Sequence, residues 1–291
     1  MRKIFVLLGI IGILGLVSAI FFFRSQVLLV TDVYFTTLYG ERRTKIKTIE
    51  TSLRLFRRVK LLTIPDDAGA DLIAFSVNNV KGKKYGVLFP YRYIDGARRY
   101  KEQASNIPVY VFGGRAQNRD QDNMEGIIFI GNDAYSDLYR AGGFAAIFAE
   151  KSGGGDVIFF QNEYLSTEER NIFEEGLKNW GFEKLPRYVS MNQDYSDNQN
   201  VSCMVMKAPA TQFLEENLDL QVILFSWVDP ALSPSQVKVM FDDSIWAFAV
   251  KALRIKNSHV LPSEIVFPES RIQDKGVLRN LKNTISNTPK L

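Results

Sequence analysis

The pattern of apolar and polar positions between Ile127 and Phe182 predicts two consecutive strand–helix units. Ile127–Ile130 and Val157–Phe160 are uninterrupted apolar runs of strand length. Each is followed by apolar residues three or four positions apart, which is the period of a buried helix stripe. Ser166 and Glu169 have the spacing of a capping box at the start of the second helix. Because the apolar runs do not alternate with polar residues, we expect strands buried on both faces, in a parallel sheet between helices.

The same pattern continues over most of the chain and predicts further strands. These are Val27–Val30, Val59–Ile64, Leu72–Val77, Tyr85–Phe89, Val109–Phe112, Tyr188–Met191, Val222–Trp227, Val237–Phe241 and Ser263–Phe267. Helical stripes predict a long helix over 36–57, a short one over 95–103 and another that begins at Ile245. Residues 201–217 are interpreted as an irregular helix broken by Pro209, and the end of the chain as a basic, polar tail.

Two halves of this pattern resemble each other. Val27–Asp32 matches Val157–Asn162, and Leu72–Asn78 matches Val222–Asp229. We therefore predict an α/β fold of two similar Rossmann-like lobes, each with a parallel sheet, joined by a hinge and preceded by an N-terminal hydrophobic helix. The expected domains are a signal anchor or signal peptide over 1–24, an N-terminal α/β lobe over 25–131, a C-terminal α/β lobe over 132–254 whose first helix spans 133–151, and a hinge-return segment with a polar tail over 255–291.

The start of the chain contains an apolar segment long enough to cross a membrane. Ile4–Phe23 is nearly apolar and has Arg2-Lys3 before it and Arg24 after it. Twenty residues of helix span about 30 Å, the thickness of the hydrocarbon core of a bilayer. A signal peptide cleaved after Val17-Ser18-Ala19 would leave four large apolar residues at the new terminus, so we favour an uncleaved anchor. Because only two residues separate Arg24 from the first strand, an anchor would hold the folded part close to the membrane.

The composition excludes several classes of function. A net charge of +4, without a basic stripe that has interleaved aromatic residues, does not indicate a nucleic-acid partner. The single Cys203 excludes an internal disulfide, and the single His259 excludes most histidine-based catalysis and metal binding. Neither a G-x-S-x-G elbow nor a phosphate-binding loop is present. Adjacent carboxylates such as Asp66-Asp67 and Asp242-Asp243 point apart, which does not suit a metal site. From these observations together we predict no enzyme activity, no cofactor and no metal site.

Acidic and amide residues follow several of the predicted strands. In open α/β sheets ligands bind beyond the carboxyl ends of the strands, although Asn and Asp at such positions also cap helices. Carboxylates and amides pair with ligand hydroxyls, and flat aromatic rings cover an apolar ligand face. The candidate ligand-binding residues are Asp32, Tyr34, Asn78, Tyr91, Asn132, Asp133, Asn162, Trp227, Asp229 and Asp242. Trp246 shares its predicted helix with Phe248 and Leu253, so we assign it to the core.

Over residues 26–270 the chain resembles the type 1 periplasmic binding proteins. This family includes sugar-binding relatives of LacI-type repressors and the basic membrane lipoprotein nucleoside receptors. The resemblance rests on strand order and on three segments. Ile127–Asp133 leads into a long helix, Val157–Asn162 opens the second lobe, and Val237–Asp243 is similar to a late strand of the family that ends in a ligand-binding Asp. The helix-turn-helix of a repressor and the lipobox cysteine of a nucleoside receptor are both absent.

The resemblance implies an extracytoplasmic solute-binding protein. Such a protein would close its two lobes over a small polar ligand, a sugar or a nucleoside, for an ABC-type permease or a sensor, with Asp242 as a ligand contact. It would be anchored in the cytoplasmic membrane facing the periplasm, or exported to the periplasm. The first alternative is a membrane-anchored structural or interaction protein with a degenerate binding-protein fold, which the short tether supports. The second is an enzyme of the cell envelope.

Overall fold

The computed structural model describes most of the folded part of the chain. The described residues are 25–33, 58–115, 125–161, 165–190, 200–206, 220–228, 233–242 and 259–289, with 12, 214, 230–231 and 247–248. The predicted membrane segment, apart from Gly12, and the predicted helix over 36–57 lie outside them. No helix within the described ranges is long and apolar enough to cross a bilayer.

The chain forms two compact units. Unit 1 consists of Met1–Gly131 and Phe248–His259, and unit 2 of Asn132–Ala247 and Val260–Leu291. The chain therefore passes from one unit to the other three times, and neither unit is a single continuous segment.

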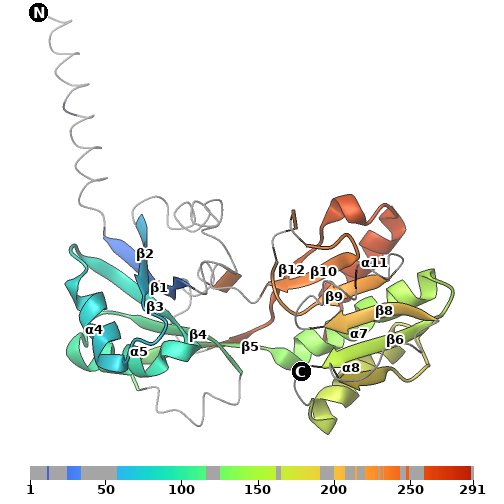
Figure 1. Ribbon diagram of the computed structural model, residues 1–291, viewed down its shortest axis with the longest axis horizontal. Helices are drawn as coiled ribbons and strands as arrows, with labels where there is room; N and C mark the ends of the chain where they lie inside the picture. The colour runs from blue at the N-terminus through green and yellow to red at the C-terminus, as the bar shows by residue number, and fades with distance from the viewer. Residues whose placement is uncertain are drawn as a thin grey trace, which may run out of the picture. The chain divides into compact units, whose positions relative to one another are not determined.

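Unit 1 is built on a six-stranded sheet, sheet A (Figure 1). Its strand order is β11 (His259–Leu261), β5 (Ile127–Asn132), β4 (Val109–Arg115), β3 (Lys84–Pro90), β1 (Gln26–Asp32) and β2 (Arg58–Ile64). β1 pairs in parallel with β2 and β3, and β3 with β4. The helices α4 (Ala70–Asn79) and α5 (Ile94–Gln103) pack Ile73, Ala97 and Tyr100 against one face of the sheet.

Unit 2 is built on a second six-stranded sheet, sheet B. Its strand order is β12 (Glu264–Val266), β10 (Val237–Asp242), β9 (Gln221–Leu224), β8 (Val201–Met206), β6 (Asp156–Gln161) and β7 (Arg187–Ser190). β12 pairs antiparallel with β10, and the other neighbouring strands of sheet B pair in parallel. The helices α7 (Ala134–Lys151), α8 (Thr167–Asn179) and α11 (Lys275–Ser286) share one core with one face of the sheet.

Strands of sheet B are buried on both faces, as the unbroken apolar runs predicted. Val157 and Phe159 of β6 belong to the core under α7 and α8, whereas Ile158 and Phe160 belong to a second core on the opposite face. The predicted capping box is also present, since the Ser166 side chain accepts from the backbone N–H of Glu169 and the Glu169 carboxylate accepts from that of Ser166.

The two sheets have the same topology, which confirms the prediction of two similar lobes. Counted from one edge, β2-β1-β3-β4-β5-β11 corresponds to β7-β6-β8-β9-β10-β12. The match of Val27–Asp32 with Val157–Asn162 is correct in this respect, because β1 and β6 occupy equivalent positions. The match of Leu72–Asn78 with Val222–Asp229 is wrong, because the first segment is helix α4 and the counterpart of β9 is β4.

Other predicted elements also need correction. The segment interpreted as an irregular helix begins with the central strand β8, Val201–Met206, whose Cys203, Met204, Val205 and Met206 are fully buried. The predicted strand Val222–Trp227 ends earlier, at Leu224, and bends at Phe225. The tail predicted to be only polar contains α11, and Leu281 of this helix is fully buried.

Helices α7 and α8 touch each other through glycines. A Cβ on Gly176 would lie 2.1 Å from the carbonyl oxygen of Tyr139, and one on Gly142 would lie 2.2 Å from that of Phe173. Real Cβ atoms do not approach this closely, so the distance between these helices requires glycine at both positions.

Candidate functional site

The carboxyl edge of sheet A carries a buried polar cluster. In open α/β sheets of this strand order, ligands bind beyond the carboxyl ends of the strands, at the point where the order reverses. In sheet A that point lies between β1 and β3. Asp32 is the last residue of β1, and the 3-10 turn η1 (Tyr91–Tyr93) follows β3 directly. The sheet therefore brings Asp32 next to Arg92 and Tyr93, although Tyr93 is 61 positions after Asp32 in the sequence.

Asp32 is fully buried and is paired by two side chains. The Tyr93 hydroxyl donates to Asp32 Oδ2 at 2.5 Å, and Arg92 Nη1 lies 3.0 Å from the same oxygen. Arg92 Cζ also lies 4.9 Å from the centre of the Tyr93 ring. Burial, and then the contact with Asp32, raise the pKa of the Tyr93 phenol. Tyr93 therefore remains a hydrogen-bond donor at neutral pH, and Asp32 holds the Arg92 guanidinium in one orientation.

Arg92 is the member of this cluster that reaches solvent. Its side chain is 43% exposed, whereas that of Asp32 is 0% exposed. A guanidinium has five N–H donors in a rigid plane, and Asp32 occupies only part of them. The neighbouring Tyr91 is half-buried and packs edge-on against Phe129, with ring centres 6.2 Å apart. The exposed chemistry of this edge is therefore a fixed cation beside an aromatic ring.

The structure brings together only some of the predicted site residues. Asp32 and Tyr91 lie at the switch point of sheet A. Asn78 is not at a strand end, because it is the penultimate residue of α4, where its exposed amide donates to Gln103. In a β-α-β unit the helix returns to the amino edge of the sheet, so Asn78 lies at the edge opposite Asp32.

The remaining predicted residues lie near the crossing segments and in unit 2. Asn132 ends β5, and its buried Oδ1 has no hydrogen-bond partner among the described residues. Asp242 ends β10 and is fully buried, and Trp227 follows β9 and is also buried. Tyr34, Asn162 and Asp229 lie outside the described residues, as does Trp246. The switch point of sheet B, between β6 and β8, is therefore described only in part.

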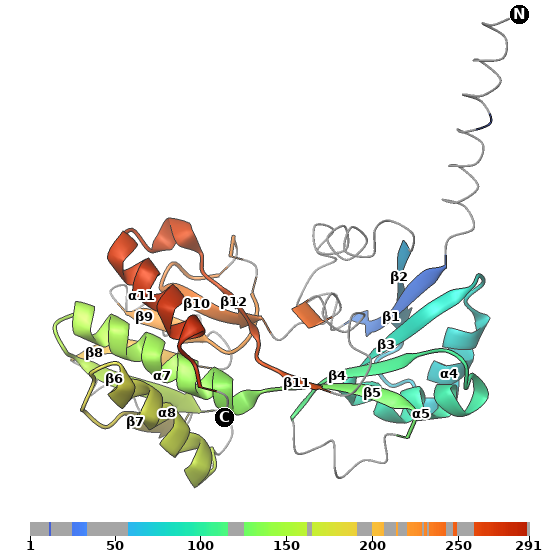
Figure 2. The ribbon, with the colours of Figure 1, turned by 180° about the vertical axis from the view of Figure 1, so that it is seen from behind.

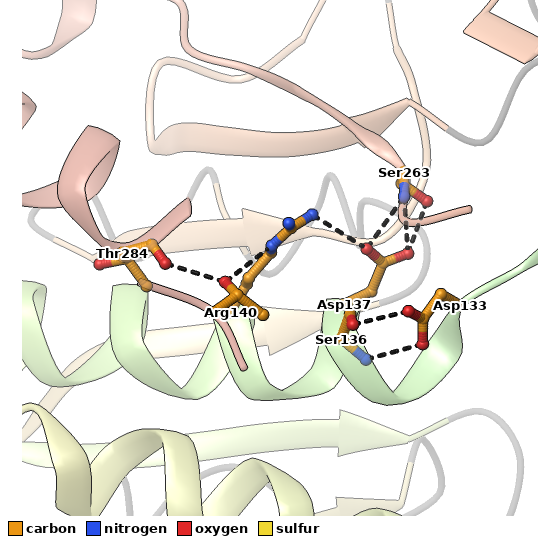
Figure 3. A network of polar contacts seen from close by, with 7 residues as sticks. Asp133, Ser136, Asp137, Arg140, Ser263 and Thr284 are labelled. Carbon is orange, nitrogen blue, oxygen red and sulfur yellow. Dashed lines mark hydrogen bonds and ion pairs between the residues drawn. The ribbon is translucent and has the colours of Figure 1, made fainter. Parts of the chain in front are cut away.

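Asp133 caps a helix and belongs to a polar network at the start of α7 (Figure 3). Its carboxylate accepts from Ser136 N–H at 3.1 Å and from Ser136 Oγ at 2.6 Å. Its own backbone N–H donates to the carbonyl of Leu261 at 2.9 Å. The alternative of a helix cap, which the sequence left open, therefore describes Asp133.

Asp137, one turn further along α7, fixes the returning chain in unit 2. Its carboxylate accepts from Ser263 N–H at 3.0 and 3.2 Å and from Ser263 Oγ at 2.6 Å (Figure 3). Arg140 Nη1 lies 3.9 Å from this carboxylate, and Arg140 Nε donates to Thr288 Oγ1 at 3.0 Å. The two segments that enter unit 2 after β5 and after β11 are thus joined by buried polar contacts.

Asp137 should make the stability of unit 2 depend on pH. Burial raises the pKa of its carboxyl to about 6, while Ser263 and Arg140 act in the opposite direction. Because this pKa lies above its ordinary value of 3.8, the protonated form stabilises the folded state. That contribution is fully present below about pH 4 and is lost as the pH rises through about 6.

We expect the wild type to lose stability relative to Asp137→Asn as the pH rises: the difference between their free energies of unfolding should fall by roughly 3 kcal/mol between about pH 4 and pH 7. The size follows from the raised pKa of Asp137, since one pKa unit corresponds to about 1.4 kcal/mol. Urea unfolding of unit 2 at several pH values measures this difference. Asp156→Asn replaces a half-exposed carboxylate of the same unit and should follow the wild type. A constant difference between wild type and Asp137→Asn across this range would contradict the assignment.

The sequence did not indicate Arg92, Asp137 or Ser263 as important residues. Arg92 directly follows the candidate residue Tyr91. Its position just after a predicted strand was the one signal in the sequence that could have indicated it as a site residue. Asp137 and Ser263 are 126 residues apart, so no local pattern shows their contact. Within the described ranges, no three His, Cys, Asp or Glu side chains are grouped as a metal site requires.

Comparison with known proteins identifies the fold. A periplasmic solute-binding protein of an ABC transporter from Actinobacillus succinogenes 130z, solved with D-allose, is 14% identical; 86% of this chain and 100% of that chain are covered, with a TM-score of 0.56. A LacI transcriptional regulator from a Rhodococcus species is 12% identical over 83% and 96% of the two chains, with a TM-score of 0.55. A Mycobacterium smegmatis protein in complex with β-D-fucofuranose is 14% identical over 90% and 98%, with a TM-score of 0.53.

These structures show that the chain has the fold of the type 1 periplasmic binding proteins, which confirms the predicted fold class. No protein-family model matches the sequence, and no curated protein matches it. Since receptors and transcriptional regulators share this fold, the similarity alone does not assign an activity.

Proposed function

We propose that the chain is an extracytoplasmic solute-binding protein for a small polar ligand of the sugar or nucleoside class, which it passes to an ABC-type permease or a sensor. The observation that carries this proposal is the Asp32–Arg92–Tyr93 cluster at the switch point of sheet A. Ligands of open α/β sheets bind at this point. The N-terminal apolar segment would hold the protein at the cytoplasmic membrane facing the periplasm, or direct its export.

The chemistry of the cluster suits a hydroxylated ligand. Arg92 offers planar N–H donors to hydroxyl oxygens, and the half-exposed Tyr91 ring offers a flat surface to a sugar or base. Asp32 acts as a positioning residue, because it is buried and contacts Arg92 rather than solvent. The sugars in two of the similar structures, D-allose and β-D-fucofuranose, support the sugar class over other small solutes.

We expect at least one compound from a panel of sugars and nucleosides to raise the melting temperature of the full chain. Arg92→Ala should weaken the binding of that compound about 10- to 100-fold, because hydrogen bonds from a charged donor contribute about 1.5–3 kcal/mol. Arg99→Ala is the matched control: Arg99 is 50% exposed on α5 and pairs with Asp71 and Glu102. Titration calorimetry of the three proteins measures the change, and equal affinities for wild type and Arg92→Ala would contradict the assignment.

One observation favours a second function, a membrane-anchored structural or interaction protein. The carboxylates of Asp32 and Asp242 are both fully buried, so neither is exposed to pair with a ligand hydroxyl. A degenerate binding-protein fold would use such residues for packing alone. This alternative predicts that no compound of the panel shifts the melting temperature, and that the full chain co-purifies with a membrane protein.

A further inference from the structure

The amino edge of sheet A carries a concentration of positive charge that the proposed ligand site does not use. Five basic residues lie at the start of β2, in the loop that leads into β3 and at the first position of β3. We call them the basic edge: Arg58, Lys60, Lys81, Lys83 and Lys84. Arg58, Lys60, Lys81 and Lys83 are exposed, and within the described ranges none of these four forms an ion pair with a carboxylate.

The beginnings of β2 and β3 lie on either side of the beginning of β1 (Figure 2). In the parallel register, Gln26 lies between Arg58 on one side and Lys84 on the other. Its backbone N–H donates to the carbonyl of Lys83 at 2.8 Å, and its side chain donates to that of Lys81, also at 2.8 Å. Ser25 accepts from the backbone N–H of Arg58 at 3.2 Å.

Arg24 directly follows the apolar segment Ile4–Phe23 and lies two residues before Gln26. Two residues of chain span at most about 7 Å, and neighbouring strands are about 5 Å apart. The beginnings of β2 and β3 therefore lie within roughly 12 Å of Arg24. This is comparable to the distance of about 8–10 Å over which charges act in physiological salt. A segment anchored in a bilayer would thus hold the basic edge within reach of the headgroups.

Most of the acidic residues that the structure describes in unit 1 are at the opposite edge of the same sheet. They follow the carboxyl ends of strands or lie in the first turns of the helices: Asp32, Asp66, Asp67, Asp71 and Asp95. Among the described residues, only Glu102 and Glu125 are acids placed near the amino edge, and Glu102 is paired with Arg99. Burial, and then the repulsion of Lys60, lower the pKa of the Lys84 ammonium.

We propose that the basic edge docks unit 1 onto the anionic phospholipid headgroups of the membrane that holds the apolar segment. Each lysine or arginine near such a surface adds to the attraction. Docking by the amino ends of the strands would turn the carboxyl edge, with Arg92, away from the lipid. The inference rests on the anchoring of Ile4–Phe23 and not on ligand binding, so a failure of the ligand experiments would leave it intact.

The test compares lysine reactivity in the full chain, assembled in nanodiscs of phosphatidylcholine alone or with roughly one-third phosphatidylglycerol. Mass spectrometry measures how fast a water-soluble acetylating reagent modifies each lysine. Lys60, Lys81 and Lys83 should react about threefold more slowly in the anionic discs, and about 1 M salt should restore their rates, because it shortens the screening length to about 3 Å. Lys178 and Lys275, which are exposed on unit 2, should react equally in both discs.

A pair of matched variants separates docking from general attraction. Lys81→Glu with Lys83→Glu should remove the protection of Lys60, whereas Lys178→Glu with Lys275→Glu should leave it unchanged. Equal rates in both disc types, an equal slowing at Lys178 and Lys275, or failure of the chain to enter the discs would each overturn the proposal. Protection found only in native membranes would also overturn it, and would indicate an acidic membrane protein as the partner.

Discussion

Gly176→Ala is expected to destabilise unit 2 by about 3 kcal/mol, because overpacking a tight contact costs about 1–3 kcal/mol and occasionally more. The new Cβ would lie 2.1 Å from the Tyr139 carbonyl oxygen, which is backbone and cannot rotate away. Helices α7 and α8 would have to separate along their length. Alanine has a better helix propensity than glycine by about 1 kcal/mol, and this gain offsets part of the destabilisation that the clash causes.

Tryptophan fluorescence during urea unfolding measures this effect selectively. All three tryptophans, Trp180, Trp227 and Trp246, lie within residues 132–247 of unit 2. The control is Glu175→Ala, because Glu175 is an exposed residue of the same helix and surface substitutions usually change the stability by less than about 0.5 kcal/mol. An unfolding midpoint for Gly176→Ala that coincides with the wild type would show that the helices do not meet at this glycine.

Arg271→Ala is expected to destabilise unit 2 by a similar amount, about 3 kcal/mol, since hydrogen bonds from a charged donor contribute about 1.5–3 kcal/mol each and are not additive. Arg271 lies in η2 (Glu269–Arg271), and its guanidinium joins the segment between β9 and β10 to that turn. It donates to Ser233 Oγ at 3.0 Å, to the Pro234 carbonyl at 2.6 Å and to the Val237 carbonyl at 3.2 Å, as well as to the carbonyls of Pro230 and Ser233.

Removal of the guanidinium would take one donor away from each of these carbonyls, although the Pro234 carbonyl keeps the backbone N–H of Val237 and the Pro230 carbonyl keeps Ser233 Oγ. Arg271→Lys should recover only part of the loss, because an ammonium has three donors and no planar fork. Arg279→Ala, an exposed arginine of α11, should stay within about 0.5 kcal/mol of the wild type. The fluorescence assay applies again, and a wild-type midpoint for Arg271→Ala would show that water replaces these bonds at no cost.

The sequence predicted the elements with strong local signals. Between Ile127 and Phe182 the apolar runs, the helical spacing and the capping box all favour the same structure, and the structure contains it. Segment Leu72–Val77 was misassigned because its run is apolar except for Ser76. Leu72 and Phe75 of α4 are in fact exposed, and only Ile73, Ala74 and Val77 are buried. Exposure of two large apolar residues is a property of the folded unit that a sequence does not display.

Tertiary context decided the other errors. Val201–Met206 contains a cysteine and two methionines, which have no marked strand preference, yet the segment lies between β6 and β9 in the middle of sheet B. α11 had usable signals, since Asp274 caps it and Val277, Leu278, Leu281 and Ile285 have helical spacing. The candidate site was predictable at Asp32 and Tyr91, because strand ends are local features. The partners of Asp32 were not, because β3 reaches β1 only after the sheet has formed.

The three passages of the chain between the units have a consequence for its synthesis. Leu281 of α11 is fully buried in the core that α7 shares with sheet B. During translation, α7 and most strands of unit 2 leave the ribosome long before residues 275–286 do. The nascent unit must therefore wait with an uncovered apolar surface, and that interval is when chaperones and proteases would compete for it.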